Sequence, residues 1–368
     1  MCIMDSMPVV EPTNLMEYEA QAKSLLPREY YDYYAGGAGD EVTLKENRAA
    51  FERIGIIPRV LVDVSTIDMS TTILSQPIRL PALIAPTAFH TLACPDGELA
   101  TAKAAALAGT IMVLSTLSNT PLEDVAKGST GPLWFQLYIY RDRSLTRELV
   151  MRAEAAGYQA ICVTVDAPVL GKRERDIKNR FALPYGISIA NLAGDPRGTM
   201  STIPSGSSLS DYFQQFLDQS LRWEDVEWLK SITSLPIVLK GIQHPEDGRL
   251  AVEHGASAII VSNHGGRQLD TVPGTIDLLP YVVDAVQDRL EVLMDGGIRR
   301  GTDMVKALAL GAKAILIGRP ILWGLSIGGE TGVLKILNLL AQELNHAMAL
   351  CGATKVTEIR QDLLKVPR

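Results

Sequence analysis

The sequence predicts an α/β fold: a closed TIM (β/α)8 barrel with an N-terminal helical cap segment and a long loop after strand 4. Three observations predict it. One pattern recurs along the chain: an amphipathic stretch is followed by Gly or Ala and then by a short apolar run. There are eight such apolar runs, and each is followed by helix-forming sequence. Nearly every run ends in a polar residue, and in a closed barrel these ends meet on one face.

The apolar runs are short and rich in Ile and Val, which is typical of parallel strands buried on both faces. The runs span 81–88, 107–116, 133–138, 155–166, 236–241, 253–263, 291–296 and 309–319. Between the last two, Thr302 is expected to N-cap a helix that Gly311 closes. The polar residues at the strand ends are Thr87, Ser115, Gln136, Asp166, Lys240, His264, Asp295 and Arg319.

We expect the 368 residues to form a single domain, 1–368. Residues 1–80 form the cap, residues 81–325 hold the barrel strands, and residues 326–368 form C-terminal helices. The connection 167–235 is too long for an ordinary barrel loop and is interpreted as a lid or insertion. Its middle, 194–210, is rich in Gly, Ser and Pro and is expected to be a mobile loop.

The composition excludes several classes of protein. Apolar residues at 47% and charged residues at 21% are typical of a globular chain. A net charge of −7 without a basic block argues against nucleic acid or an anionic membrane as partner. No run reaches the ~20 apolar residues of a spanning helix, and no export signal is recognised. Four distant cysteines predict neither a metal site nor disulfides, so a cytoplasmic location is expected.

The segment SNHGGRQLD, 262–270, predicts proton-transfer chemistry at the barrel mouth. Side chains alternate along a strand, so Ser262 and His264 share one face. A histidine beside Arg267 suits removal of a proton from a substrate whose anionic group the arginine holds. A capping histidine with a solvated arginine is the alternative. Asp166, which shares a strand face with Thr164, is placed to orient His264.

The segments 293–303 and 316–320 predict a phosphate site, because glycines and arginines follow strands seven and eight. Backbone N–H groups at Gly297 and Gly318, with Arg299 or Arg319, would neutralise a phosphate. Lys240 has no carboxylate neighbour in sequence, so a role at the site is favoured over simple burial. Trp134, Gln136 and Tyr138 share a face, and contact with a polar ring system or core packing both remain open. The other histidines, including His90, for which the sequence indicates no partner, are assigned to the surface or to positions directly behind the site.

These segments resemble the FMN-dependent 2-hydroxy acid oxidase family, which includes plant glycolate oxidases and bacterial L-lactate oxidases. The most specific segment is SNHGGRQLD. It is joined by DYYAGGAGDE, IAPTAFH, FQLYIYRDR, TVDAPVLGKRERD, LPIVLKG and DGGIRRGTD. The segments VLSTLS, DAPVLG and GRPILWGL are most similar to the cyanobacterial type of L-lactate oxidase.

The resemblance implies FMN as cofactor and a role for each matching residue. Flavin contacts would come from Pro86, Thr87, Ala88, Ser115, Gln136, Tyr138, Thr164, Lys240 and Ser262. The phosphate would lie against Asp295, Gly296, Gly297, Arg299, Gly318 and Arg319. Lys240 would stabilise negative charge on the reduced flavin.

The same resemblance implies the substrate-binding and catalytic residues. Arg173 and Arg267 would clamp the substrate carboxylate with help from Tyr33. Tyr138 would contact the hydroxyl or keto oxygen. His264 would be the base, and Asp166 would stabilise its protonated form.

The implied reaction oxidises small (S)-2-hydroxy acids to 2-keto acids while O2 is reduced to H2O2. L-Lactate is expected to be preferred, because plant glycolate oxidases carry Trp where this chain has Leu117. Hydride and carbanion routes use the same residues. A glycolate oxidase, a dehydrogenase with another electron acceptor, a different FMN barrel such as an isomerase, and a barrel that only binds FMN are the alternatives. A homo-oligomer, tetramer or octamer, is also implied.

Overall fold

The computed structural model describes residues 11–195 and 208–366. Eight parallel strands close into a barrel in the order β10-β11-β4-β5-β6-β7-β8-β9. They are β4 (Ala82–Ile84), β5 (Met112–Ser115), β6 (Leu133–Leu137), β7 (Ile161–Thr164), β8 (Ile237–Ile242), β9 (Ala258–Val261), β10 (Glu291–Met294) and β11 (Ala314–Ile317). The predicted TIM barrel is confirmed, and every strand lies within one residue of its predicted run.

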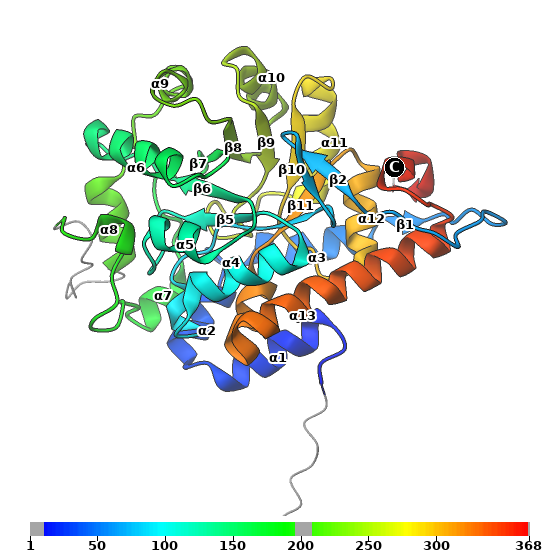
Figure 1. Ribbon diagram of the computed structural model, residues 1–368, viewed down its shortest axis with the longest axis horizontal. Coiled ribbons are helices and arrows are strands. Elements are labelled where there is room, and N and C mark those ends of the chain that lie inside the picture. The colour runs from blue at the N-terminus through cyan, green and yellow to red at the C-terminus, as the bar shows by residue number, and fades with distance from the viewer. Residues whose placement is uncertain (1–10, 196–207, 367–368) are drawn as a thin grey trace, which may run out of the picture.

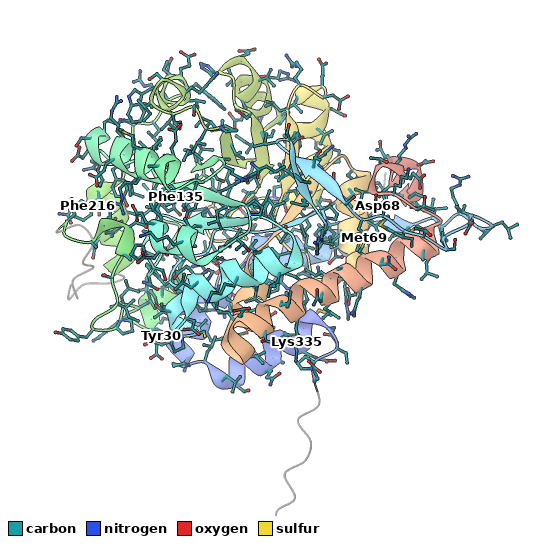
Figure 2. The ribbon with its side chains drawn as sticks, in the orientation of Figure 1. Tyr30, Asp68, Met69, Phe135, Phe216 and Lys335 are labelled. Atoms are coloured by element: carbon teal, nitrogen blue, oxygen red, sulfur yellow. The ribbon has the colours of Figure 1, made fainter. Side chains whose placement is uncertain are left out.

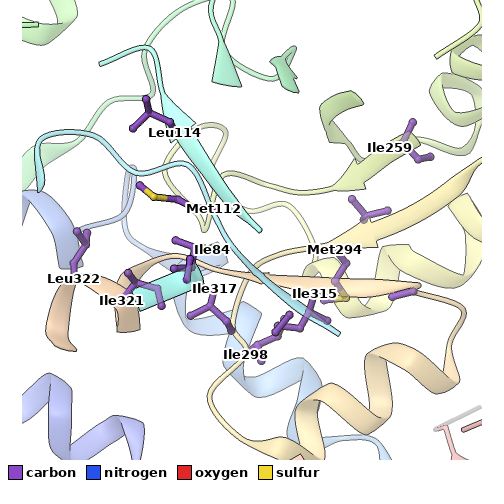
Figure 3. Close-up of a cluster of buried hydrophobic side chains, with 14 of the residues drawn as sticks. Ile84, Met112, Leu114, Ile259, Met294, Ile298, Ile315, Ile317, Ile321 and Leu322 are labelled. Carbon is purple, nitrogen blue, oxygen red and sulfur yellow. The ribbon is translucent and has the colours of Figure 1, made fainter. Parts of the chain in front are cut away.

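Helices surround the barrel, as Figure 1 shows. They are α4 (Gly97–Ala108), α5 (Leu122–Gly128), α6 (Arg143–Ala155), α9 (Glu224–Ile232), α10 (Pro245–Glu253), α11 (Thr275–Val286), α12 (Gly301–Ala309) and α13 (Arg319–Cys351). Gly328 and Gly329 interrupt the helical backbone of α13. Side chains of the neighbouring strands β4, β5 and β11 gather with Ile321 and Leu322 of α13 in one apolar layer (Figure 3).

The interior of the barrel is a second apolar cluster, formed by the alternate strand residues. It includes Leu83, Trp134 and Leu316. A hairpin of β2 (Thr71–Ile73) and β3 (Gln76–Ile78) adds Ile73 and Ile78 to this cluster. The indole of Trp134 donates a hydrogen bond to the side chain of Gln76 at 3.1 Å. The hairpin therefore covers the end of the barrel opposite the strand C-termini.

The N-terminal cap packs against the rest of the chain. Its helices are α1 (Leu15–Leu25), α2 (Arg28–Ala35) and α3 (Val42–Glu52). Strand β1 (Gly55–Ile56) pairs antiparallel with β12 (Leu364–Lys365), near the C-terminus. Helix α1 lies along α13, where Lys335 forms an ion pair with Glu11 (Figure 2).

The long connection after β7 contains α7 (Glu174–Lys178), a short 3-10 helix at 190–192, and α8 (Ser208–Phe216), before α9 completes it. The predicted mobile loop lies mostly at residues 196–207, outside the described residues. The expected N-cap at Thr302 is wrong, because α12 begins at Gly301 with Arg300 as its N-cap, so Thr302 lies inside the helix. Asp303 instead accepts hydrogen bonds from the backbone N–H groups of Arg299 (2.9 Å) and Arg300 (3.0 Å).

Candidate active site

Polar side chains from adjacent strand ends form a hydrogen-bonded row at the open end of the barrel. The strand register places Ser115 beside Gln136, and Thr164 beside Lys240. The Ser115 hydroxyl donates to Gln136 Oε1 at 3.2 Å, and Gln136 Nε2 donates to Thr164 Oγ1 at 3.0 Å. These bonds orient the Gln136 amide, because both its oxygen and its nitrogen have a hydrogen-bond partner.

A pocket opens at this end of the barrel. Every predicted cofactor-binding or substrate-binding residue lines it except Ser262. Ser262 is fully buried, and its Oγ accepts hydrogen bonds from Lys240 Nζ at 2.9 Å and from the His264 backbone N–H at 3.1 Å. Asp166 also lies behind the lining, in contact with His264. The structure thus brings the predicted residues together, with these two in a supporting layer.

His264, partly exposed to the pocket, pairs with the buried carboxylate of Asp166 at the pocket wall. His264 Nδ1 lies 2.9 Å from Asp166 Oδ1, so Nδ1 carries the proton and Nε2 is free to accept one. Burial lowers the pKa of His264, and Asp166 only partly opposes the shift. The pKa of Asp166 is lowered because His264 and Lys240 outweigh the effect of its burial. At neutral pH the pair is therefore a neutral imidazole held by a carboxylate, as a general base requires.

This pair predicts a specific pH dependence. Neutral His264 is the active form, so kcat/KM should fall as the pH drops through its lowered pKa. Asp166→Asn removes the carboxylate that raises this pKa, so the acid limb should move to lower pH. Turnover should also fall about tenfold, because protonated His264 loses its partner. Rates from pH 4 to 9 test this, with Asp284→Asn, at an exposed position on α11, as control. An acid limb that stays in place in Asp166→Asn would contradict the pairing.

Lys240 is not the unpaired lysine that the sequence suggested. Its Nζ lies 3.0 Å from Asp295 Oδ2, and both side chains are buried. Burial alone would lower the pKa of Lys240, but Asp295 and Asp166 outweigh it and the pKa is raised. The lysine is therefore a permanent cation in the pocket wall. Asp295, predicted with the phosphate residues, instead lies beside this cation.

Arg173 and Arg267 face the pocket close to His264. Arg267 Nη1 donates to the carbonyls of Tyr33 at 2.6 Å and Gly36 at 2.9 Å, and its guanidinium lies over the Tyr33 ring. Arg173 is 6% exposed, and burial with the nearby Arg267 lowers its pKa to about 10. Neither forms an ion pair with a carboxylate in the described part of the chain. Two such cations at one wall favour a bound carboxylate.

Arg299 and Arg319 supply positive charge elsewhere in the pocket lining. Arg319 donates one hydrogen bond from each guanidinium nitrogen, to the carbonyls of Tyr34, Gly36 and Gly265, all at 2.9 Å. Burial lowers the pKa of Arg299 and lowers that of Arg319 to about 9. Helix α13 starts at Arg319, so its first N–H groups lie at the same point. This arrangement suits an anion such as a phosphate.

One wall of the pocket is apolar. It contains the predicted Leu117 together with Leu209 and Phe213 of α8. The Phe213 ring meets Tyr138 edge-on, with centroids 5.1 Å apart. Burial raises the pKa of Tyr138, so its phenol remains a neutral hydrogen-bond donor. Leu209 was missed from sequence, because nothing in the amphipathic pattern of α8 indicates which apolar residue reaches the pocket.

His90 lies behind the site, one of the two placements expected for it, and it contacts a pocket residue although no partner was predicted. Its side chain is buried, with Nε2 2.6 Å from Thr87 Oγ1 and Nδ1 2.9 Å from Thr101 Oγ1. Burial lowers its pKa. The spacing of three residues after Thr87, at a strand end, is the signal that could have indicated this contact.

Residues 11–195 and 208–366 hold neither a metal-ligating cluster nor a membrane-spanning helix. These residues contain no group of three or more His, Cys, Asp or Glu side chains arranged for a metal ion. None of their helices combines the length and apolar character needed to span a membrane.

A family model, curated relatives and solved structures match this chain over most of its length. The FMN-dependent dehydrogenase family matches residues 22–366. An L-lactate oxidase of Nostoc sp. is 57% identical over 97% of this chain and 99% of the relative. A glycolate oxidase of Spinacia oleracea is 53% identical over 95% of each chain. A solved structure of mandelate oxidase with (S)-4-hydroxymandelic acid superposes with a TM-score of 0.91 at 43% identity, covering 96% of this chain and 98% of that one. The chain therefore belongs to the FMN-dependent dehydrogenase family.

Proposed function

We propose that this protein is an FMN-dependent oxidase of small (S)-2-hydroxy acids that prefers L-lactate, forms 2-keto acids and reduces O2 to H2O2. One observation carries the proposal. His264, the candidate general base held by Asp166, lies beside Arg173 and Arg267 in one pocket. A base next to a carboxylate site is what the oxidation of a 2-hydroxy acid requires.

The pocket residues fit FMN. Arg299, Arg319 and the start of α13 form a cationic, N–H-rich wall that suits its phosphate. The oriented amide of Gln136 and the cationic Lys240 offer donors to a polar ring. Bound FMN supplies the two-electron acceptor, and the protein supplies binding, orientation and proton transfer.

The side chains have distinct roles in the proposed reaction. Arg173 and Arg267 hold the substrate carboxylate, and Tyr33 lies against Arg267. Tyr138 donates a hydrogen bond to the substrate oxygen. His264 Nε2 takes a proton from the substrate, and Asp166 then stabilises the imidazolium. The overall oxidation removes two electrons and two protons from the 2-hydroxy acid. O2 takes up these two electrons and two protons to give H2O2.

Leu117 is proposed to set substrate size. It lines the pocket with Leu209 and Phe213. A leucine leaves space for the methyl group of L-lactate, whereas the indole of a tryptophan would fill that space. Leu117→Trp should move the ratio of kcat/KM values about tenfold towards glycolate, since a methyl group in an apolar pocket is worth ~1–3 kcal/mol. Steady-state rates with both acids test this. A wild type that already prefers glycolate would refute this interpretation of the wall.

Oxygen consumption with a series of short and long 2-hydroxy acids tests the function directly. Fastest turnover of L-lactate supports the proposal, and fastest turnover of glycolate makes the protein a glycolate oxidase. Substrate oxidation by an artificial acceptor without oxygen uptake indicates a dehydrogenase. If no 2-hydroxy acid is oxidised by either acceptor, another FMN reaction or simple FMN binding is favoured.

We also propose a homo-oligomer, tetramer or octamer, in the cytoplasm. The loop after β1 supports self-association, because Val60 is 80% exposed and Leu61 is fully exposed. Free Cys94, Cys162 and Cys351 suit a reducing compartment. Light scattering on the eluting protein tests the assembly, and a monomer at micromolar concentration would refute it.

A further inference from the structure

Asn47, on α3 of the N-terminal cap, lies between two loops of the candidate site. The first, residues 262–266, is named the base turn. It holds three consecutive residues with positive φ: His264 (57°), Gly265 (65°) and Gly266 (75°). The second, residues 295–299, is named the phosphate loop. Asn47 itself is 2% exposed and does not line the pocket.

The side chain of Asn47 forms a reciprocal pair with Asn263 of the base turn. Asn47 Nδ2 donates to Asn263 Oδ1 at 2.9 Å, and Asn263 Nδ2 donates to Asn47 Oδ1 at 2.8 Å. Asn263 Oδ1 also accepts from the Gly266 N–H at 3.1 Å, while its Nδ2 donates to the Pro273 carbonyl at 3.2 Å. These last two bonds fix the orientation of both amides. Asn47 therefore completes the network that holds the left-handed turn.

Asn47 also contacts the phosphate loop, through Thr275 and directly at Gly297. Asn47 Oδ1 accepts from the Thr275 N–H at 3.3 Å, and Thr275 Oγ1 donates to the Asp295 carbonyl at 2.6 Å. The backbone of Asn47 packs so closely on Gly297 that a Cβ there would lie 1.9 Å from the Asn47 carbonyl oxygen. The next residue, Arg48, donates a hydrogen bond to the Gly297 carbonyl.

We propose that Asn47 is a positioning residue that couples the phosphate loop to the base turn, so that a phosphate bound at the first also holds His264 in its working orientation. A histidine with positive φ keeps that conformation only when its surroundings enforce it. Removing Asn47 takes one of the two hydrogen-bond partners from each polar atom of the buried Asn263 amide, which weakens the turn. The inference rests on the proposed function only for the role of His264 as base.

Hydrogen exchange of the FMN-loaded protein tests the positioning role. Asn47→Leu should speed exchange about tenfold in both loops. Asn47→Asp keeps the acceptor but loses the donor, so exchange should speed mainly in the base turn. Thr43→Val is the matched control: it is buried on the same helix, and its hydroxyl donates to the Val272 carbonyl at 3.0 Å. Equal effects of the control and the Asn47 variants would overturn the proposal.

Coupling is tested by loading the full-length protein with riboflavin, which lacks the phosphate, instead of FMN. In the wild type, the base turn should exchange faster with riboflavin than with FMN, and in Asn47→Leu this difference should vanish. Equal exchange with both flavins in the wild type would overturn the coupling. In turnover, Asn47→Leu should lower kcat about threefold to tenfold and change the substrate KM by less than twofold. Exchange requires no turnover, so failure of the oxidase assignment would be seen separately, as absent oxidation.

Discussion

His264→Asn is expected to retain bound FMN and to lose about 10²–10⁴-fold in turnover of L-lactate, the usual contribution of one positioned base. Asparagine is chosen because His264 has φ of 57°, a conformation that Asn tolerates better than most residues. The amide cannot take up a proton at neutral pH, while the turn that carries it is preserved. Steady-state turnover, together with the flavin spectrum of the purified variant, gives the measurement.

His254→Gln is the control for this prediction. His254 pairs with Glu227 at 2.9 Å and stacks on Trp223, away from the pocket. Its replacement should leave turnover unchanged. If His264→Asn binds FMN and turns over at a near-normal rate, His264 is not the base.

Arg267→Lys is expected to lower kcat/KM for L-lactate about 10- to 100-fold. A lysine keeps the charge but loses the planar fork that matches a carboxylate, and charge-assisted hydrogen bonds are worth about 1.5–3 kcal/mol each. It also cannot reproduce the Nη1 bonds to the carbonyls of Tyr33 and Gly36. The loss should be larger for L-lactate than for its uncharged amide, because only the acid uses the fork.

Arg175→Lys is the matched control, since it makes the same change near the site but outside the pocket lining. Arg175 pairs with Glu41 at 2.6 Å, a bond that a lysine can largely replace. Its kcat/KM should stay within about twofold of the wild type. An Arg267→Lys enzyme with unchanged efficiency would show that the fork is not used.

The barrel and the polar residues at its strand ends could be predicted because they follow from strand periodicity, whereas the other pocket residues came from the resemblance to a family. Each apolar run ends in a polar residue, and parallel register brings such residues together, as with Ser115 beside Gln136. His264 and Asp166 are 98 positions apart, yet each follows the end of a barrel strand by two or three residues, so their meeting followed from barrel closure. The resemblance to a family singled out Arg173, which lies in a run of mixed charge where spacing selects no residue.

The missed features depend on contacts between distant segments. Lys240 looked unpaired because its partner, Asp295, comes from a strand two places away in the barrel. Asn47 gave no signal, because its role arises only when α3 packs between two loops more than 200 residues later. The N-terminus of α12 was misplaced because Asp303, inside the helix, supplies the capping that Thr302 was expected to give.

The central claim is that the pocket oxidises a 2-hydroxy acid through His264. Anaerobic addition of L-lactate to the purified yellow protein, followed by visible absorbance, tests it most directly. We expect rapid bleaching of the flavin in the wild type, recovery of the colour when O2 is admitted, and bleaching slowed about 10²–10⁴-fold in His264→Asn. A yellow wild type that no 2-hydroxy acid bleaches, or a His264→Asn protein that bleaches at the wild-type rate, would contradict it.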